Sequence, residues 1–126
     1  MAKILVVEDN EDILNLVKII LEVNNYEVLS APDGYEAIKL MECMPDLVLL
    51  DIMMPGMSGW EVLDIIRSKK EWKNTPVIAL TALAQEKDIE IGVKKHVDDY
   101  IIKPFEKKEL LDKINRVLEE YKLNEQ

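Results

Sequence analysis

Short apolar runs that end at polar residues place the strongest limit on how this chain can fold. Four of these runs are rich in valine, isoleucine and leucine, and they cover residues 4–7, 47–50, 77–80 and 100–102. Runs of this length, bounded by turn signals, are typical of strands buried on both faces of a parallel sheet. Residues 28–31 form a less apolar run that suits an edge strand. The sequence therefore predicts five strands.

Segments with helical periodicity separate the predicted strands. Apolar residues recur at helical spacing in four of them, at about 12–23, 33–44, 59–69 and 110–121. A fifth helix is predicted over 85–95, where Ile89, Ile91 and Val93 are the only large apolar residues, so we expect it to be mobile. Strands that alternate with helices favour an α/β fold, with a five-stranded parallel sheet and five helices on both faces.

Length and charge limit the classes of function. The 126 residues suit one domain, which we expect to span 1–126, with a core over about 3–121 and a frayed tail at 122–126. A formal net charge of -9 disfavours direct binding to nucleic acid or anionic membranes. One cysteine and one histidine exclude an internal disulfide and a zinc cluster. With no predicted membrane span, these features favour a cytoplasmic protein.

Polar side chains follow four of the five predicted strands. They are Glu8 and Asp9, Asp51, Thr81 and Lys103. Because the carboxyl ends of parallel strands share one edge of a sheet, these groups are expected to meet there, where ligand sites of such folds lie. Each residue taken alone has an ordinary structural explanation, for example an acid that favours a helix N-terminus. Their joint position at one edge indicates a functional site.

The chemistry of this set indicates phosphoryl transfer. Three close carboxylates repel one another unless a cation lies among them, and their hard oxygen atoms suit Mg²⁺. Lys103 supplies a positive charge and Thr81 a hydrogen-bond donor, which together can hold a phosphoryl group. Asp51 would then be the carboxylate nucleophile that acquires this group.

The sequence resembles the receiver domains of two-component response regulators over roughly residues 3–121. The resemblance is carried by Val-Glu-Asp at 7–9, Leu-Asp-Ile-Met-Met-Pro-Gly-Met-Ser-Gly at 50–59, Thr81-Ala82 and Asp-Tyr-Ile-Ile-Lys-Pro-Phe at 99–105. It implies a chemotaxis-regulator-like, flavodoxin-like domain with strand order 2-1-3-4-5, an order already known for a chemotaxis member of this family.

The resemblance also implies roles for individual residues. Asp51 would accept a phosphoryl group from a phosphohistidine of a sensor kinase or phosphotransfer protein. Mg²⁺ would be bound by Asp9, Asp51 and the backbone carbonyl of Met53, with Glu8 acting mostly through water. The product would be a phosphorylated signalling domain with self-catalysed transfer rather than an enzyme.

In such domains, phosphorylation shifts a population between two states. Thr81 would move towards the phosphoryl group, Lys103 would pair with it, and Tyr100 would turn inward. The face formed by residues 85–95, the strand at 100–102 and the last helix would then bind a downstream protein. The chain would be a monomer or a phosphorylation-dependent dimer, and either a stand-alone protein or part of a larger regulator. The Lys103-Pro104 bond resembles the family's cis peptide.

Three residues depart from common family patterns. Met53 and Leu83 are apolar at positions that influence how water reaches the aspartyl phosphate, so we expect slow self-dephosphorylation. His96 replaces the glycine that usually ends the preceding helix, which predicts backbone strain if the usual left-handed turn is kept.

The sequence disfavours two other functions and one other fold. A haloacid-dehalogenase-type phosphatase also uses a strand-end aspartate, but it carries a second aspartate where this chain has Met53. A degenerate receiver that only binds proteins is disfavoured by the intact set of Asp9, Asp51, Thr81 and Lys103. A nucleotide-binding fold is disfavoured as well, because the four glycines form no phosphate-binding loop motif.

Overall fold

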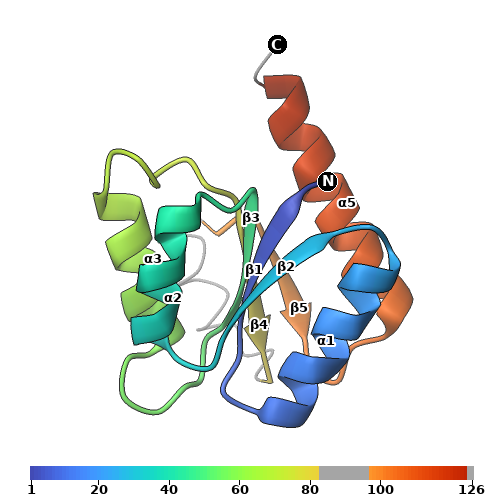
Figure 1. The fold of residues 1–126 in the computed structure, drawn as a ribbon, viewed down its shortest axis with the longest axis horizontal. Coiled ribbons are helices and arrows are strands. Elements are labelled where there is room, and N and C mark those ends of the chain that lie inside the picture. The colour runs from blue at the N-terminus through green and yellow to red at the C-terminus, as the bar shows by residue number, and fades with distance from the viewer. Residues whose placement is uncertain (83–96, 125–126) are drawn as a thin grey trace.

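The fold is a parallel sheet with helices on both faces (Figure 1). The computed structural model describes residues 1–82 and 97–124. Its strands are β1 (Lys3–Val7), β2 (Glu27–Ala31), β3 (Leu47–Asp51), β4 (Val77–Thr81) and β5 (Asp99–Ile102). They pair in the order β2-β1-β3-β4-β5, and all four pairings are parallel. The predicted five-stranded parallel sheet, its strand order and the edge position of the second strand are therefore confirmed.

The described helices are α1 (Glu11–Val23), α2 (Gly34–Leu40), η1 (Met41–Cys43, a 3₁₀ helix), α3 (Gly59–Ser68) and α5 (Lys107–Asn124). The predicted helix over 85–95 falls within 83–96, outside the described residues, so four of the five predicted α-helices are seen in the described part. Helix α5 continues to Asn124, so the predicted frayed tail begins inside a helix. None of the described helices is long and apolar enough to cross a bilayer.

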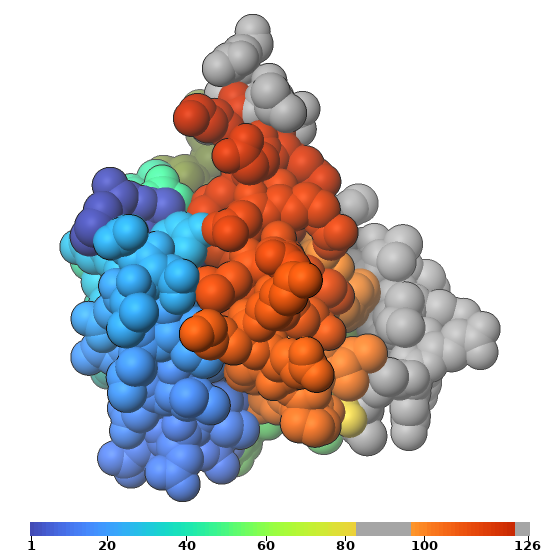
Figure 2. All heavy atoms as spheres, turned by 90° about the vertical axis from the view of Figure 1, so that its right-hand side faces the viewer, coloured from blue at the N-terminus to red at the C-terminus, as the bar shows by residue number. Residues whose placement is uncertain are grey.

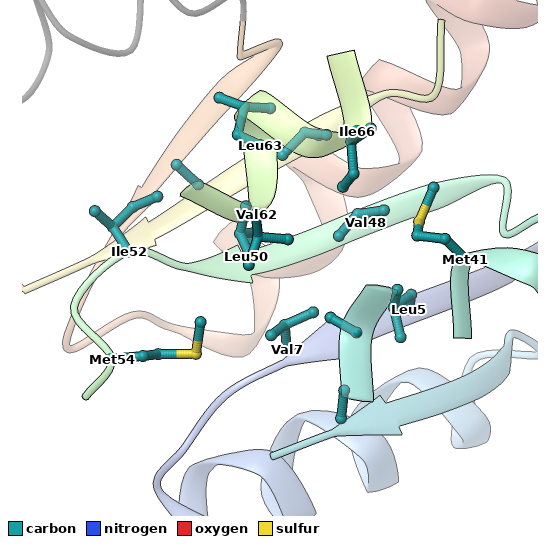
Figure 3. Close-up of a cluster of buried hydrophobic side chains, with 14 of the residues drawn as sticks. Leu5, Val7, Met41, Val48, Leu50, Ile52, Met54, Val62, Leu63 and Ile66 are labelled. Carbon is teal, nitrogen blue, oxygen red and sulfur yellow. The ribbon is translucent and has the colours of Figure 1, made fainter. Parts of the chain in front are cut away.

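Side chains of the sheet alternate between two apolar layers. On one face, α2 and α3 cover residues such as Leu5, Val48 and Leu50, and Figure 3 shows Val48 and Leu50 of β3 next to Ile66 and Val62 of α3. Both β3 and β4 are buried along their whole length. The carboxyl end of β3 is thus held by packing on both sides, which fixes the position of Asp51.

The opposite face of the sheet is covered by α1 and α5, which lie side by side (Figure 2). Val17 and Leu21 of α1 pack in the same cluster as Leu110 and Ile114 of α5. These residues recur at helical spacing, which is the periodicity that predicted both helices.

Local capping signals start the helices at the carboxyl edge of the sheet. Asn10 Oδ1 accepts a hydrogen bond from Ile13 N, Asp33 Oδ1 from Glu36 N, and Ser58 Oγ from Glu61 N. Each cap satisfies a backbone donor of the first helical turn. These caps fix where α1, α2 and α3 begin.

Candidate functional site

The site residues predicted from the sequence come together at the carboxyl edge of the sheet. Asp51 ends β3, Thr81 ends β4, and Lys103 follows β5 directly. Glu8 and Asp9 follow β1, the strand that pairs with β3. Arrowheads in Figure 1 point towards this edge. The parallel register therefore brings all five side chains to one place.

Three carboxylates form the centre of the site. Each of Glu8, Asp9 and Asp51 contributes an oxygen atom, and these atoms lie within 4.8 Å of one another. Glu8 is fully buried and Asp51 is 2% exposed, whereas Asp9 is exposed to solvent. Hard oxygen ligands at this spacing, with one open side, fit a divalent cation such as Mg²⁺.

The Lys103 side chain brings a positive charge to the three carboxylates. Its Nζ atom lies 2.5 Å from Glu8 Oε1 and 3.5 Å from Asp51 Oδ1. The backbone N–H of Lys103 donates to Thr81 O at 2.8 Å, and the peptide bond to Pro104 is cis, as predicted. The lysine therefore reaches the carboxylates from a backbone that β4 holds in place.

The loop after β3 shapes the surroundings of Asp51. Met53 N donates a hydrogen bond to Asp51 Oδ1 at 3.2 Å, and the Met53 side chain is 62% exposed at the rim of the site. Gly59, the first residue of α3, donates its N–H to Ile52 O at 2.9 Å. A Cβ atom at Gly59 would lie 2.3 Å from Asp51 O. This close approach was not predicted, because its only signal in the sequence is the glycine itself.

Thr81 and Tyr100 occupy the β4–β5 side of the site. Thr81 is 5% exposed, and Tyr100 is half-buried against the core beneath α2 and α3. Lys113 of α5 donates to Tyr100 O at 2.5 Å and lies 3.7 Å from Asp99. The link from α5 to the backbone of Tyr100 was not predicted. Leu83 and His96, which the sequence singled out, lie outside the described residues.

Burial and the two neighbouring carboxylates favour the protonated form of Asp51. Burial, followed by hydrogen bonds with Glu8 and Asp9, raises the pKa of Asp51 to about 8, although Lys103 opposes the shift. Burial also acts to raise the pKa of Asp9, but hydrogen bonds with Asp51 and Glu8 outweigh it and lower that pKa overall. The buried carboxylates therefore favour a proton on Asp51, and a bound cation would relieve the same repulsion.

The raised pKa of Asp51 predicts how the free energy of unfolding depends on pH when no cation is added. An unfolded Asp51 loses its proton near pH 3.8, whereas the folded group keeps it until about pH 8. The unfolded state therefore binds fewer protons between these values, so the free energy of unfolding falls as pH rises. Asp51→Asn should remove this loss and stabilise the fold by about 2 kcal/mol above pH 8, and little below pH 4. Urea unfolding of wild type and Asp51→Asn in the presence of a chelator, below pH 4 and above pH 8, measures the difference in the free energy of unfolding. An equal stabilisation by Asp51→Asn at both pH values would contradict the raised pKa of Asp51.

Known proteins of the same kind match nearly the whole chain. The family model described as the response regulator receiver domain matches residues 4–115. The transcriptional regulatory protein CpxR of Escherichia coli K12 is 38% identical over all 126 residues, which cover 53% of that protein. The chain thus spans about half the length of the curated relatives that it matches.

Two solved structures extend the likeness to the fold. The chemotaxis protein CheY4 of Vibrio cholerae is 33% identical, with a TM-score of 0.88 over 93% of this chain and 98% of that one. The receiver domain of sensor histidine kinase PA1611 from Pseudomonas aeruginosa is 31% identical, with a TM-score of 0.85 over 93% of this chain and 97% of that one. That structure has a magnesium ion coordinated in its active-site cleft.

Proposed function

Because the chain belongs to the family of response regulator receiver domains, we propose that Asp51 accepts a phosphoryl group from a phosphohistidine of a sensor kinase or phosphotransfer protein. One observation carries this proposal: a buried carboxylate at a strand end lies beside two further carboxylates and a lysine. The family is one of signalling proteins, so the transfer modifies the domain itself instead of turning over a separate substrate.

Asp9 and Asp51, with the backbone carbonyl of Met53, would hold Mg²⁺, and Glu8 would act mostly through water. The ion supplies electrostatic stabilisation of the transferring phosphoryl group. In the transfer, an Asp51 oxygen forms a bond to phosphorus while the bond to the donor atom breaks, and the donor leaves with the electron pair. Thr81 would donate its hydroxyl to the phosphoryl group, and Lys103 would pair with its charge.

The response to phosphorylation would run from Thr81 to Tyr100 and then to the face that includes β5 and α5, together with the predicted helix over 85–95. That face would bind a downstream protein. A net charge of -9 disfavours direct contact of this domain with nucleic acid or membranes. Oligomeric state would be monomeric, or dimeric on phosphorylation.

A metal-ligand variant tests the magnesium-dependent transfer. Acetyl phosphate with Mg²⁺ should add one phosphoryl group to the wild type, and a chelator should prevent it. Asp9→Asn should slow this reaction at least about tenfold, because it removes a ligand charge. Asp12→Asn is the matched control, since Asp12 is an exposed acid in the first turn of α1. Equal rates for the two variants, measured by intact mass, would rule out the role of Asp9.

The phosphoryl group on Asp51 should be lost slowly. Met53 lies at the rim of the site. Leu83 is apolar at a position that, in the family, influences how water reaches the aspartyl phosphate. Met53→Asn places a polar group at the rim and should shorten the lifetime by about tenfold, because an oriented water attacks more readily. The decay of phosphorylated protein after removal of the donor measures the lifetime. A wild-type lifetime of seconds would contradict slow dephosphorylation.

A further inference from the structure

The loop after β3 contains two adjacent methionines in opposite environments. Met53 is 62% exposed, whereas Met54 is 7% exposed and belongs to the buried cluster that Figure 3 shows. Peroxides oxidise a methionine thioether to a sulfoxide, and the reaction requires that the sulfur be accessible from solvent. Of this adjacent pair, Met53 is therefore the residue that a dissolved peroxide reaches.

The other methionines lie elsewhere or are covered. All six methionines fall within residues 1–82, which the structure describes. Met41 and Met54 are buried, Met57 packs partly buried against the same core, and Met1, Met44 and Met53 are exposed. Met1 precedes β1 and Met44 precedes β3, so both lie where these strands begin. Met53 is the exposed methionine at the carboxyl edge of the sheet, beside the proposed acceptor.

The backbone of Met53 is tied to Asp51. Its N–H donates a hydrogen bond to Asp51 Oδ1 at 3.2 Å. The Met53 side chain therefore begins at a point that is fixed relative to the carboxylate. A thioether sulfur is only a weak hydrogen-bond acceptor, so it holds water poorly. A sulfoxide is polar, and its oxygen would place a hydrogen-bond acceptor at this rim.

We propose that Met53 is a redox-sensitive modification site, at which oxidation by a peroxide shortens the lifetime of the phosphoryl group on Asp51. This inference rests on the proposed function. The Met53 sulfur donates an electron pair to one peroxide oxygen, the O–O bond breaks, and the other oxygen leaves as water. The sulfur is oxidised to the sulfoxide while the peroxide is reduced.

The sulfoxide would act on hydrolysis of the aspartyl phosphate. A water oxygen bonds to phosphorus, the bond from phosphorus to the Asp51 oxygen breaks, and Asp51 regains its carboxylate with the electron pair. Inorganic phosphate leaves with both hydrogens of the water. The Met53 sulfoxide oxygen accepts a hydrogen bond from this water and so orients it towards phosphorus. Because the side chain is exposed, the added oxygen stays in solvent and needs no buried partner.

Mapping of the oxidised residues tests the site without any phosphorylation. After limited treatment with hydrogen peroxide, peptide fragmentation by mass spectrometry should find sulfoxide at Met53 at least about tenfold faster than at buried Met54. Exposed Met44 should be oxidised at a rate similar to that of Met53. Oxidation of Met53 that is no faster than oxidation of Met54 would overturn the proposal.

The lifetime of the phosphoryl group tests the consequence of oxidation. Protein treated with peroxide and then freed of it is phosphorylated with acetyl phosphate and Mg²⁺. Intact mass then follows the decay of oxidised and unoxidised molecules in one sample. A fraction of the oxidised wild type, equal to the Met53 sulfoxide found by mapping, should lose its phosphoryl group about tenfold faster than unoxidised molecules.

Two leucine variants locate the effect. Met53→Leu can be oxidised only at other methionines, so its oxidised and unoxidised molecules should have equal lifetimes. Met44→Leu is the matched control, because it removes an exposed methionine outside the site and should keep the fast fraction. Equal lifetimes in the wild type, or a fast fraction that persists in Met53→Leu, would overturn the proposal. Untreated wild type that gains no phosphoryl group would instead contradict the proposed function, and the mapping would still decide whether Met53 is the oxidised residue.

Discussion

Gly59→Ala is expected to destabilise the fold by about 3 kcal/mol and to slow phosphorylation about tenfold or more. The new methyl group would lie 2.3 Å from Asp51 O and 2.6 Å from Ile52 Cα. Both are backbone atoms, so the clash moves either α3 or the loop that carries the acceptor. Alanine is otherwise the better helix former by about 1 kcal/mol, so a loss of stability here opposes intrinsic propensity.

Two other glycines provide matched controls for Gly59→Ala. Gly56 has φ +77°, and among the described residues beyond its two chain neighbours no atom lies within 4 Å of the position that an added methyl group would take, so Gly56→Ala should cost only about 1 kcal/mol of backbone strain. At Gly34 the nearest atoms belong to the Val62 and Met57 side chains, of which the methionine can move. Guanidinium unfolding and the initial rate with acetyl phosphate measure both effects. A Gly59→Ala protein as stable and as fast as Gly56→Ala would contradict the close approach.

Asp98→Ala is expected to cost about 3 kcal/mol of stability, although Asp98 lies at the other end of β5 from Lys103. Its Oδ2 accepts from the backbone N–H of buried Val77 at 2.7 Å and lies 3.5 Å from Arg67 Nη2. Its Oδ1 accepts from Tyr121 OH at 2.9 Å. The residue thereby joins α3, β4 and α5, and its loss leaves a buried amide donor without its acceptor.

A titration of the tyrosines distinguishes loss of the Asp98 hydrogen bond to Tyr121 from a general loss of packing. Burial, followed by the hydrogen bond to Asp98, raises the pKa of Tyr121 to about 12. In Asp98→Ala, one tyrosine should titrate nearer to the ordinary value of 10.0 in an alkaline absorbance titration. Asp46→Ala is the control, because Asp46 is an exposed acid that accepts from Lys3 N. Equal stability losses for the two variants, with an unchanged titration, would contradict the role of Asp98.

Local patterns in the sequence were sufficient to predict the strands and most of the helices, and the family resemblance implied the order of the strands. An apolar run such as 47–50 and a cap such as Ser58 act on neighbouring residues, so one sequence carries the signal. Parallel pairing then brings Asp51 and Lys103 to one edge of the sheet. The site could be predicted because its members lie at strand ends.

Contacts between residues distant in the sequence could not be predicted in the same way. Nothing local to Asp98 indicates that its carboxylate accepts from Tyr121, and nothing local to Lys113 indicates that it donates to Tyr100 O. The partner of Lys103 is a further example. The sequence indicated that it would hold a phosphoryl group, whereas in the structure its Nζ atom lies 2.5 Å from Glu8 Oε1 and 3.5 Å from Asp51 Oδ1. Which partner a side chain contacts depends on distances that differ by about 1 Å in the folded protein, and a local residue pattern does not encode them.

The most direct measurement of the central claim is the intact mass of wild type and Asp51→Asn after incubation with acetyl phosphate and Mg²⁺. We expect the wild type to gain one phosphoryl group and Asp51→Asn to gain none, because an amide cannot act as the carboxylate nucleophile. Circular dichroism of both proteins confirms that the comparison is between folded domains. A wild type that gains no phosphoryl group, or an Asp51→Asn protein that gains one equally well, would contradict the claim that Asp51 is the phosphoacceptor.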